Sequence, residues 1–314
     1  MREKNYINEI NKLRKEKNAV VLAHYYQNSE IQDIADFIGD SFALAKQARN
    51  NDAGIIVMAG VKFMAETIKI LAPEKKVIIP DPEAGCSLAD SCKPEDFKNF
   101  IEENSERKII SYINSSVEIK AMSDIICTSS NALEIIESLP ENEKIIFAPD
   151  RNLGNYIKSK TNRDIKVWNG TCHVHEAFSL EAILKLKKDY PDAKLIVHPE
   201  CELPVRMIAD FIGSTSALLK FTEENKDKIF IVATEPGIFH QMKKINPDKI
   251  FIPVPPKDST CGCNECNFMK LITTEKIYFS LLNEKPEIII ESEILEKARK
   301  PILRMMEIAS MSGL

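Results

Sequence analysis

Residues 34–46 read IADFIGDSFALAK, and residues 208–220 read IADFIGSTSALLK. Nine of the thirteen positions are identical, and the second stretch begins 174 residues after the first. A weaker copy, DIICTSSNAL at residues 124–133, lies between them and aligns when one residue is inserted after Ser129. The copies are therefore spaced by roughly 87 residues, and such a fixed spacing indicates a chain built from three repeats.

An apolar run precedes each copy and turns polar at its end. The runs are AVVLAHYYQ from Ala19, KIISYINSS from Lys108 and KLIVHPECE from Lys194, and each is typical of a buried strand. Helical spacing follows each copy, and strands and helices alternate after it, which predicts parallel sheets. We predict an α/β fold of three similar αβα sandwich units with pseudo-threefold symmetry around a central site. The first unit, with an N-terminal helix, covers residues 1–105, the second covers 106–190, and the third, with C-terminal helices, covers 191–314.

The repeats place polar side chains at matching positions. Aligning the copies superimposes the hydroxyl residues Ser41, Ser129 and Thr215. Seventeen positions earlier stand His24, Tyr112 and His198, and fifteen positions earlier stand Tyr26, Asn114 and Glu200. The two histidines taken singly are typical of core residues, but their shared register favours a functional role.

The three hydroxyl residues stand where helices are expected to begin. They are predicted to be helix N-caps, and a helix N-terminus offers unpaired N–H groups to an anion. An ordinary capping role is the alternative to anion binding. The matching polar strand ends favour an anion-binding surface.

Composition restricts the class of protein. The chain has 314 residues, of which 44% are hydrophobic, which is ample for a core. A net charge of −5 disfavours nucleic acid as a partner. Residues 1–18 form a charged helical pattern rather than a signal peptide, and no apolar run approaches the ~20 residues of a membrane span. We therefore expect a soluble, cytoplasmic protein without a membrane partner.

The chain contains eight cysteines, which in a cytoplasmic protein indicate metal binding or catalysis. They are Cys86, Cys92, Cys127, Cys172, Cys201, Cys261, Cys263 and Cys266. The third predicted strand of each repeat is followed by a cysteine: Cys86, then Cys172, then one of the last three. Ligands gather at the carboxyl ends of parallel strands, so three thiolates are expected to converge. Such a set fits an iron–sulfur cluster with one free iron, or a zinc site with an open position, and either is a Lewis acid.

The remaining cysteines and histidines have simpler interpretations. Cys127 and Cys201 have no counterpart in the other repeats and are expected to be buried apolar residues. Cys92 lies farther from its strand than Cys86. His173 and His175 follow Cys172, so at least one of them is expected near the metal. His240 is interpreted as structural, because it lies on a helical pattern.

The sequence closely resembles the quinolinate synthase (NadA-type) family over nearly its whole length. The motifs that carry the resemblance are AHYYQ, GDS, MAET, DPEAGCSLADSC, SYINSS, TSSNA, FAPDRNLG, NGTCHVHEAF, HPEC, IGSTS, ATEPG and CNECNFMK. The resemblance implies three αβα domains around one site and an oxygen-sensitive four-iron four-sulfur (4Fe-4S) cluster with three cysteine ligands. It also implies condensation of iminoaspartate with dihydroxyacetone phosphate to quinolinate, and a transient contact with the L-aspartate oxidase that supplies the imine.

The resemblance also implies the cluster ligands. Cys86 in GCSLAD and Cys172 in GTCHVH match two of them, and Cys266, which precedes Phe268 and Met269, matches the third. The C-x-C-x-x-C spacing departs from the C-x-x-C-x-x-C of some members, so Cys263 remains an alternative.

Site roles follow from the family chemistry and the matched registers. The candidates for proton transfer are Tyr26, Tyr112, Glu200 and His24. The predicted substrate-binding residues are His24, Ser41, Tyr112, Asn114, Ser129, His198, Glu200, Ser214 and Thr215. Ser41 and Ser129 suit a phosphate or carboxylate, whereas His198, Ser214 and Thr215 suit a carboxylate of the aspartate-derived substrate.

Two other functions fit three converging thiolates. One is a zinc-dependent aldolase or dehydratase. The other is an oxygen-sensing iron–sulfur regulator, which the net charge and the absence of a helix-turn-helix pattern disfavour.

Overall fold

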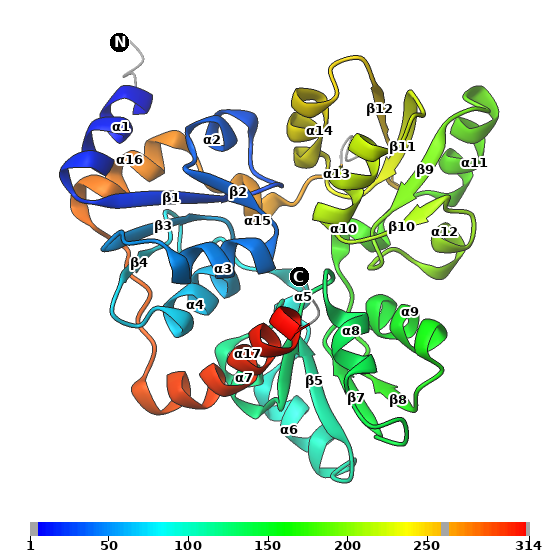
Figure 1. Ribbon diagram of the computed structural model, residues 1–314, viewed down its shortest axis with the longest axis horizontal. Coiled ribbons are helices and arrows are strands. Elements are labelled where there is room, and N and C mark those ends of the chain that lie inside the picture. The colour runs from blue at the N-terminus through cyan, green and yellow to red at the C-terminus, as the bar shows by residue number, and fades with distance from the viewer. Residues whose placement is uncertain (1–5, 259–263, 312–314) are drawn as a thin grey trace.

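Three four-stranded parallel sheets organise the protein (Figure 1). We analysed a computed structural model, which describes residues 6–258 and 264–311. The first sheet has the order β2-β1-β3-β4, with β1 at Ala19–His24, β2 at Phe37–Gly39, β3 at Ile55–Ala59 and β4 at Lys76–Ile78. The second is β6-β5-β7-β8, with β5 at Lys108–Tyr112, β6 at Ile125–Cys127, β7 at Ile145–Ala148 and β8 at Ile165–Val167. The third is β10-β9-β11-β12, with β9 at Lys194–Val197, β10 at Phe211–Ile212, β11 at Ile229–Ala233 and β12 at Ile250–Pro253. We call these sheets and their helices the first, second and third units.

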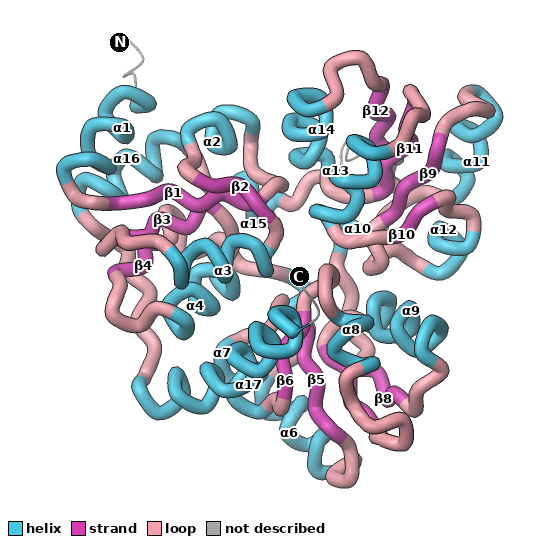
Figure 2. The backbone as a smooth tube through the Cα atoms, in the orientation of Figure 1, coloured by secondary structure: helices cyan, strands magenta, loops and turns pink. Residues whose placement is uncertain are grey.

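The helices repeat in the same order as the strands, which confirms the predicted α/β fold of three similar units. A helix precedes each central strand: α1 (Tyr6–Glu16), α6 (Pro94–Glu102) and α11 (Leu180–Asp189). Three more helices follow the first three strands of each sheet. In the first unit they are α2 (Ser29–Ile34), α3 (Ser41–Asn50) and α4 (Lys62–Leu71), and in the second they are α7 (Val117–Met122), α8 (Ala132–Glu137) and α9 (Arg151–Thr161). In the third they are α12 (Leu203–Met207), α13 (Thr215–Glu224) and α14 (Phe239–Ile245), and the 3-10 turn η1 (Pro236–Ile238) precedes α14. Helices surround each sheet (Figure 2), and every residue of β3 and β7 is buried, as expected for parallel sheets covered on both faces.

The repeated motif forms the short edge strands β2, β6 and β10. Sequence analysis did not predict these strands, because two or three residues are too few to show a period of two. An aspartate just before each strand, at Asp36, Asp124 and Asp210, fixes its position. Each carboxylate accepts a hydrogen bond of 2.8 Å from a backbone N–H of the neighbouring central strand. The motif therefore sets the register at the edge of every sheet.

The helices that follow the motif begin differently from the prediction. Asp40 caps α3 through a hydrogen bond from Ala43 N, and Ser214 caps α13, so Ser41 and Thr215 are the first helical residues. The predicted hydroxyl caps at Ser41, Ser129 and Thr215 are therefore wrong, by one residue in the first and third units, because an equally good acceptor precedes the hydroxyl.

In the second unit a turn delays the helix. The Oδ1 atom of Asn131 accepts a hydrogen bond of 2.7 Å from the N–H of Thr128, and α8 begins only after Asn131. Ser129 therefore lies in the turn and not at the helix cap. The inserted residue that the alignment requires in this copy lies in the same segment.

Helices α3, α8 and α13 are each capped at the C-terminus by a cationic side chain. This side chain comes from the segment just before the last strand of the same sheet. Lys75 donates to the carbonyl oxygens of Ala48 and Asn51 at the end of α3. Arg163 donates to carbonyl oxygens that follow α8, and Lys249 does so at the end of α13. A cation near the helix C-terminus compensates the partial negative charge there.

The C-terminal helices tie the first unit to the second. Helix α16 (Thr274–Asn283) packs against α1, and α17 (Ser292–Met311) packs across α4 of the first unit and α7, β6 and α8 of the second. Among the described residues, no helix is both long and apolar enough to cross a membrane.

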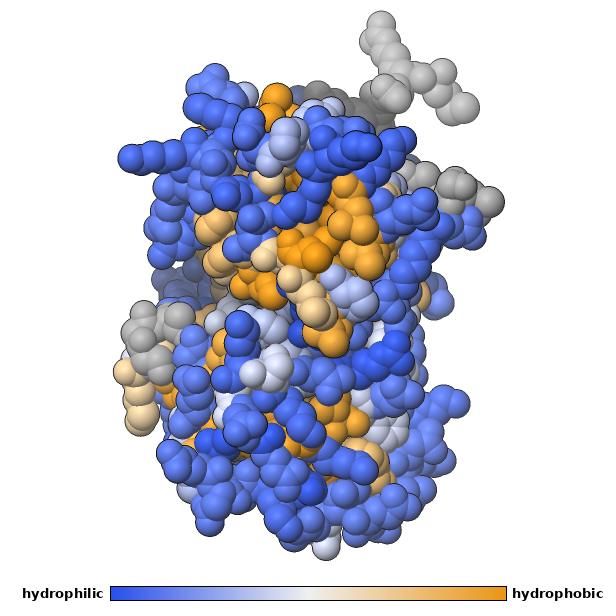
Figure 3. Space-filling view, turned by 90° about the vertical axis from the view of Figure 1, so that its right-hand side faces the viewer, coloured by the Kyte–Doolittle hydropathy of each residue, from blue (hydrophilic) through white to orange (hydrophobic). Residues whose placement is uncertain are grey.

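Polar side chains cover most of the face in Figure 3, and the largest apolar area lies in its upper half, with smaller ones below it. The third unit exposes several large apolar side chains, among them Leu184, Leu203 and Met207. The bulk of the apolar residues lie in the core.

Candidate active site

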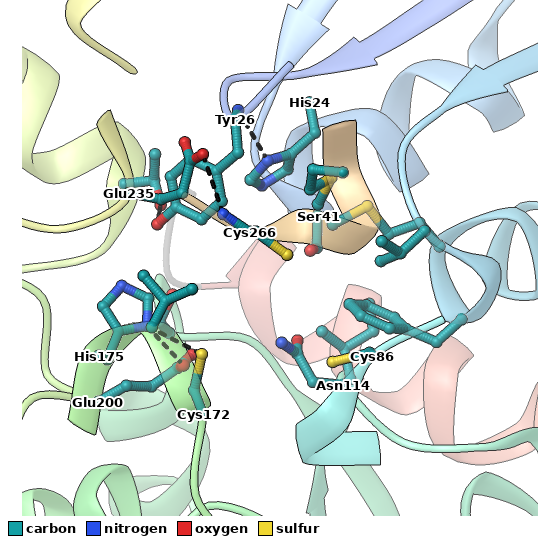
Figure 4. Close-up of a pocket in the computed structure, with 18 of the residues that line it drawn as sticks. His24, Tyr26, Ser41, Cys86, Asn114, Cys172, His175, Glu200, Glu235 and Cys266 are labelled. Atoms are coloured by element: carbon teal, nitrogen blue, oxygen red, sulfur yellow. Dashed lines mark hydrogen bonds and ion pairs between the residues drawn. The ribbon is translucent and has the colours of Figure 1, made fainter. Parts of the chain in front are cut away.

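A cavity lies where the three units meet, at the carboxyl ends of their central strands (Figure 4). Its volume of about 70 Å³ is enough for several water molecules. The predicted residues that line it are His24, Tyr26, Ser41, Cys86, Tyr112, Asn114, Ser129, Cys172, His198, Glu200, Thr215 and Cys266. Each sheet contributes the crevice beside its central strand, which is where ligands bind to doubly wound α/β sheets.

Three cysteines reach the cavity by the same local structure. Cys86, Cys172 and Cys266 each follow the last strand of a sheet, and each is the N-cap of a four-residue helix: α5 (Ser87–Asp90), α10 (His173–Glu176) and α15 (Asn267–Lys270), respectively. Their sulfur atoms point into one space (Figure 4). The structure thus brings one thiol from each unit to a common centre.

The charge state of the three thiols depends on what they bind. Burial raises the pKa of Cys86 to about 12 and raises the pKa of Cys172 and Cys266. Repulsion from another cysteine of the set adds to the shift of Cys86 and of Cys172, and repulsion from Glu235 adds to that of Cys266. Backbone N–H groups of the short helices act in the opposite direction. Three adjacent thiols favour ionisation only when a cation compensates their charge, so this set of donors fits a metal centre.

The other described cysteines do not line the cavity. Cys92, Cys127 and Cys201 are buried, as expected for small apolar residues. Cys261 and Cys263 lie outside the described residues, so the alternative of Cys263 as third ligand stays open there.

A hydrogen-bond chain joins the two predicted tyrosines across the cavity wall. Tyr112 OH donates to Glu200 Oε1 at 2.6 Å, and Glu200 Oε2 lies 3.0 Å from His175 Nδ1. His175 Nε2 lies 3.0 Å from Thr234 Oγ1, which lies 2.8 Å from Tyr26 OH. The chain passes through all three units. A proton can move along such a chain without entering solvent.

The protonation states of the residues in this chain determine which of them can donate a proton and which can accept one. Burial raises the pKa of Tyr26 and of Tyr112 well above 10, so both phenols are neutral donors. Burial opposes ionisation of Glu200, but the interaction with His175 and the hydrogen bonds from His175 and Tyr112 outweigh it and lower the pKa of Glu200. Glu200 is therefore a carboxylate at neutral pH.

The two matched histidines are neutral. Burial lowers the pKa of His24 to about 4 and that of His198 to about 3. The Nδ1 atom of His24 accepts a hydrogen bond of 3.1 Å from the N–H of Tyr26, and Nδ1 of His198 accepts one of 3.4 Å from the N–H of Glu200. Each ring therefore carries its proton on Nε2.

The expectation that a histidine after Cys172 lies near the metal centre agrees with the position of His175. Its Nδ1 atom is 3.3 Å from Cys172 Sγ. The potential ligand atoms of Cys172, His175 and Glu200 all lie within 4.8 Å of one another. The cavity thus contains a group of side chains able to bind a metal. His173 is turned to Ser87, with Nδ1 2.7 Å from the Ser87 hydroxyl.

Polar atoms without partners mark where a ligand can bind. Asn114 Oδ1 and Thr128 Oγ1 are buried, have no hydrogen-bond partner and belong to residues that line the cavity. Ser41 and Ser129 line the same cavity. Ser214 does not line it, and its hydroxyl accepts a hydrogen bond from Ala217 N. His240 lies outside it and pairs with Asp33 at 2.8 Å.

An ion pair of buried Glu235 with half-buried Lys270, which the sequence patterns did not predict, supports the third cysteine. Glu235 Oε1 lies 3.0 Å from Lys270 Nζ and accepts a hydrogen bond of 3.3 Å from Cys266 N. Lys270 also donates to the Tyr26 carbonyl oxygen at 2.7 Å. Thr234 and Glu235 directly follow β11, so the rule that strand ends carry the site, applied to every strand, finds them.

Comparisons with known proteins agree with this site. The sequence profile of the family described as Quinolinate synthetase A protein (NadA) matches residues 8–307. The quinolinate synthase of Microcystis aeruginosa is 56% identical over 300 residues, covering 96% of this chain and 94% of that protein. Those of a Synechocystis strain and of Chloroherpeton thalassium are 55% and 54% identical, each again covering 96% of this chain and 94% of the relative. The chain therefore belongs to the quinolinate synthase family.

Proposed function

We propose that the cavity catalyses the condensation of iminoaspartate with dihydroxyacetone phosphate to quinolinate, phosphate and two waters. The atoms of this reaction balance without an oxidant or reductant. The observation that carries the proposal is the convergence of Cys86, Cys172 and Cys266 on a cavity that also holds the chain from Tyr112 to Tyr26. Membership of the quinolinate synthase family supports it.

We infer that the three cysteines hold a 4Fe-4S cluster. Three protein thiolates leave one iron of such a cluster without a cysteine ligand, and when bound the cluster supplies a Lewis acid to the substrate. The N–H groups at the starts of α5, α10 and α15 can donate to the sulfur atoms and so stabilise their negative charge.

The polar wall binds the substrate anions. Ser41, at the start of α3, and Ser129, together with the unpartnered atoms of Asn114 and Thr128, suit the phosphate or a carboxylate. His198, through Nε2, and Thr215 suit a carboxylate of iminoaspartate. Ser214 was predicted for this role, but Thr215 is the residue of the pair that lines the cavity.

The hydrogen-bond chain moves the protons of the two dehydrations. Glu200 is ionised and accepts a proton, whereas Tyr112 is neutral and donates one. Tyr26 at the other end of the chain, and the nearby His24, are the remaining donors. Because the side chains of His24, Tyr26, Tyr112 and Glu200 are all at most 9% exposed, the chemistry proceeds away from bulk water that hydrolyses the imine. Substrate entry therefore requires the units to separate transiently.

Anaerobic purification and assay test this function. We expect a brown protein with about four iron and four sulfide per chain, and quinolinate formed from the two substrates. Colourless protein with one zinc per chain would instead favour a zinc-dependent aldolase or dehydratase, for which the proximity of Cys172, His175 and Glu200 is the specific support. A cluster-containing protein that forms no quinolinate would favour an oxygen sensor.

A further inference from the structure

The side chain of Asp40 forms hydrogen bonds with both of the other units, separately from the chain between Tyr112 and Tyr26. Its Oδ2 atom accepts a hydrogen bond of 2.8 Å from Ser130 Oγ of the second unit and one of 2.6 Å from Ser216 Oγ of the third. Its Oδ1 atom accepts a third bond, of 3.0 Å, from Ala43 N in its own helix. Asp40 is 7% exposed and lines the cavity.

Each partner in this cluster is the neighbour of a hydroxyl residue that lines the cavity. Asp40 precedes Ser41, Ser130 follows Ser129, and Ser216 follows Thr215. The hydroxyls of Ser41, Ser129 and Thr215 come from three different units, so their spacing depends on how the units are held together. The hydrogen bonds at Asp40 connect the three backbone segments that carry them.

We propose that Asp40 is a positioning residue that sets the distance between the three substrate-facing hydroxyls by joining the starts of α3, α8 and α13. It does not act on the reacting atoms itself. Both hydrogen bonds from Ser130 and Ser216 have to break when the units separate, so Asp40 also favours the closed cavity. The effect on kinetics rests on the proposed function, whereas the effect on the units does not.

The carboxylate is suited to this task because of its charge. Hydrogen bonds to an ionised acceptor are stronger than those between neutral groups. An amide at this position keeps the shape but has one oxygen in place of two. Asp40→Asn is therefore expected to retain part of the effect, and Asp40→Ala none of it.

Hydrogen exchange tests the joining of the units without reference to any reaction. In the purified holoprotein, Asp40→Ala is expected to speed amide exchange in the first turns of α8 and α13, by about 10- to 100-fold for the loss of one charged hydrogen bond at each. Ser179→Ala, which removes the N-cap bond of α11 to Ala182 N, is the matched control and is expected to act only within α11. Faster exchange confined to α3 in Asp40→Ala would overturn the proposal.

Kinetics test the positioning role. Asp40→Ala is expected to raise KM by about 10- to 100-fold with a smaller change in kcat, and Asp40→Asn to recover part of this loss. Ser216→Ala and Ser130→Ala are expected to give smaller effects of the same kind. In a double-mutant cycle, Asp40→Ala with Ser216→Ala is expected to cost less than the sum of the single changes.

The outcomes are separable from those of the proposed function. If the wild type forms no quinolinate, the proposed function fails, but the exchange experiment still decides the role of Asp40. If Asp40→Ala does not fold, the exchange at α3 and α13 in Ser216→Ala answers the same question. Additive single and double variants would show that Asp40 and Ser216 act independently and would overturn the inference.

Discussion

Tyr112 donates a hydrogen bond of 2.6 Å to Glu200, a residue of the neighbouring unit. Both side chains are buried, at 5% and 2% exposed. The bond connects a neutral phenol, which can donate a proton, to a carboxylate, which can accept one. Because the partners belong to different units, the donor and acceptor meet only when the second and third units are closed on each other.

Replacing Tyr112 tests the proton-transfer role. We expect Tyr112→Phe to lower kcat for quinolinate formation by at least about a hundredfold, because the variant keeps the ring but loses the donor. The anaerobic assay should be combined with the visible absorption of the cluster, which is expected to be unchanged. Tyr190→Phe is the control, since Tyr190 is 40% exposed and does not line the cavity. Equal activity of both variants would contradict the role of Tyr112.

Serine variants of the cysteines test the ligand assignment. Cys172→Ser is expected to lose the cluster and the activity, because it removes one of the three converging sulfur atoms. Cys201→Ser is expected to keep both. Cys201 is fully buried and does not line the cavity, and its thiol donates a hydrogen bond of 3.4 Å to Ala233 O, which a serine hydroxyl can also make. The iron content and visible absorption of each variant test the ligand assignment. A colourless Cys201→Ser protein would refute it.

The buried histidines predict how stability depends on pH. Because burial lowers the pKa of His24 to about 4, below its value near 6.5 in the unfolded chain, the unfolded state binds more protons as the pH falls through this range. The free energy of unfolding should therefore drop, by about 2 kcal/mol between pH 7 and pH 5 from His24 alone. His24→Gln should weaken this dependence in urea unfolding of metal-free protein. Parallel curves for the wild type and the variant would contradict the prediction.

The sequence predicted the repeated architecture because its signals are local. Long apolar runs mark β1, β5 and β9, and the polar residues after them, such as His24 and Glu200, follow from the rule that parallel strands end at the ligand. The matching cysteines could be predicted for the same reason. The spacing of the repeats can be read from the sequence without any knowledge of how the units are arranged in space.

Contacts between the units could not be predicted. The bonds from Ser130 and Ser216 to Asp40 join residues up to 176 positions apart, and nothing in the local pattern distinguishes these serines from surface residues. The position of Glu235 after β11 follows from the strand-end rule, but its pairing with Lys270 could not be predicted. The N-cap of α3 was predicted one residue too late, because Asp40 accepts the capping hydrogen bond in place of Ser41.

A glycine at the boundary of the first and third units provides the last prediction. A Cβ atom on Gly237 would lie 2.7 Å from both Cα and C of Tyr26 and 2.7 Å from Glu235 Oε2. Backbone atoms cannot turn away as a side chain does, so Gly237→Ala has to push the units apart. It would then stretch the bonds from Tyr26 OH to Thr215 and Thr234, which are 2.9 and 2.8 Å long.

We expect Gly237→Ala to lower the free energy of unfolding by about 1–3 kcal/mol and to reduce quinolinate formation. Gly54→Ala is the matched control, because a Cβ atom there meets nothing within 4 Å. That variant should be neutral or slightly more stable, since alanine restricts the unfolded chain. Urea unfolding and the anaerobic assay measure both variants. If Gly237→Ala behaves like Gly54→Ala, the first and third units can move apart at this contact at little cost in free energy. The contact then does not hold Tyr26 in place.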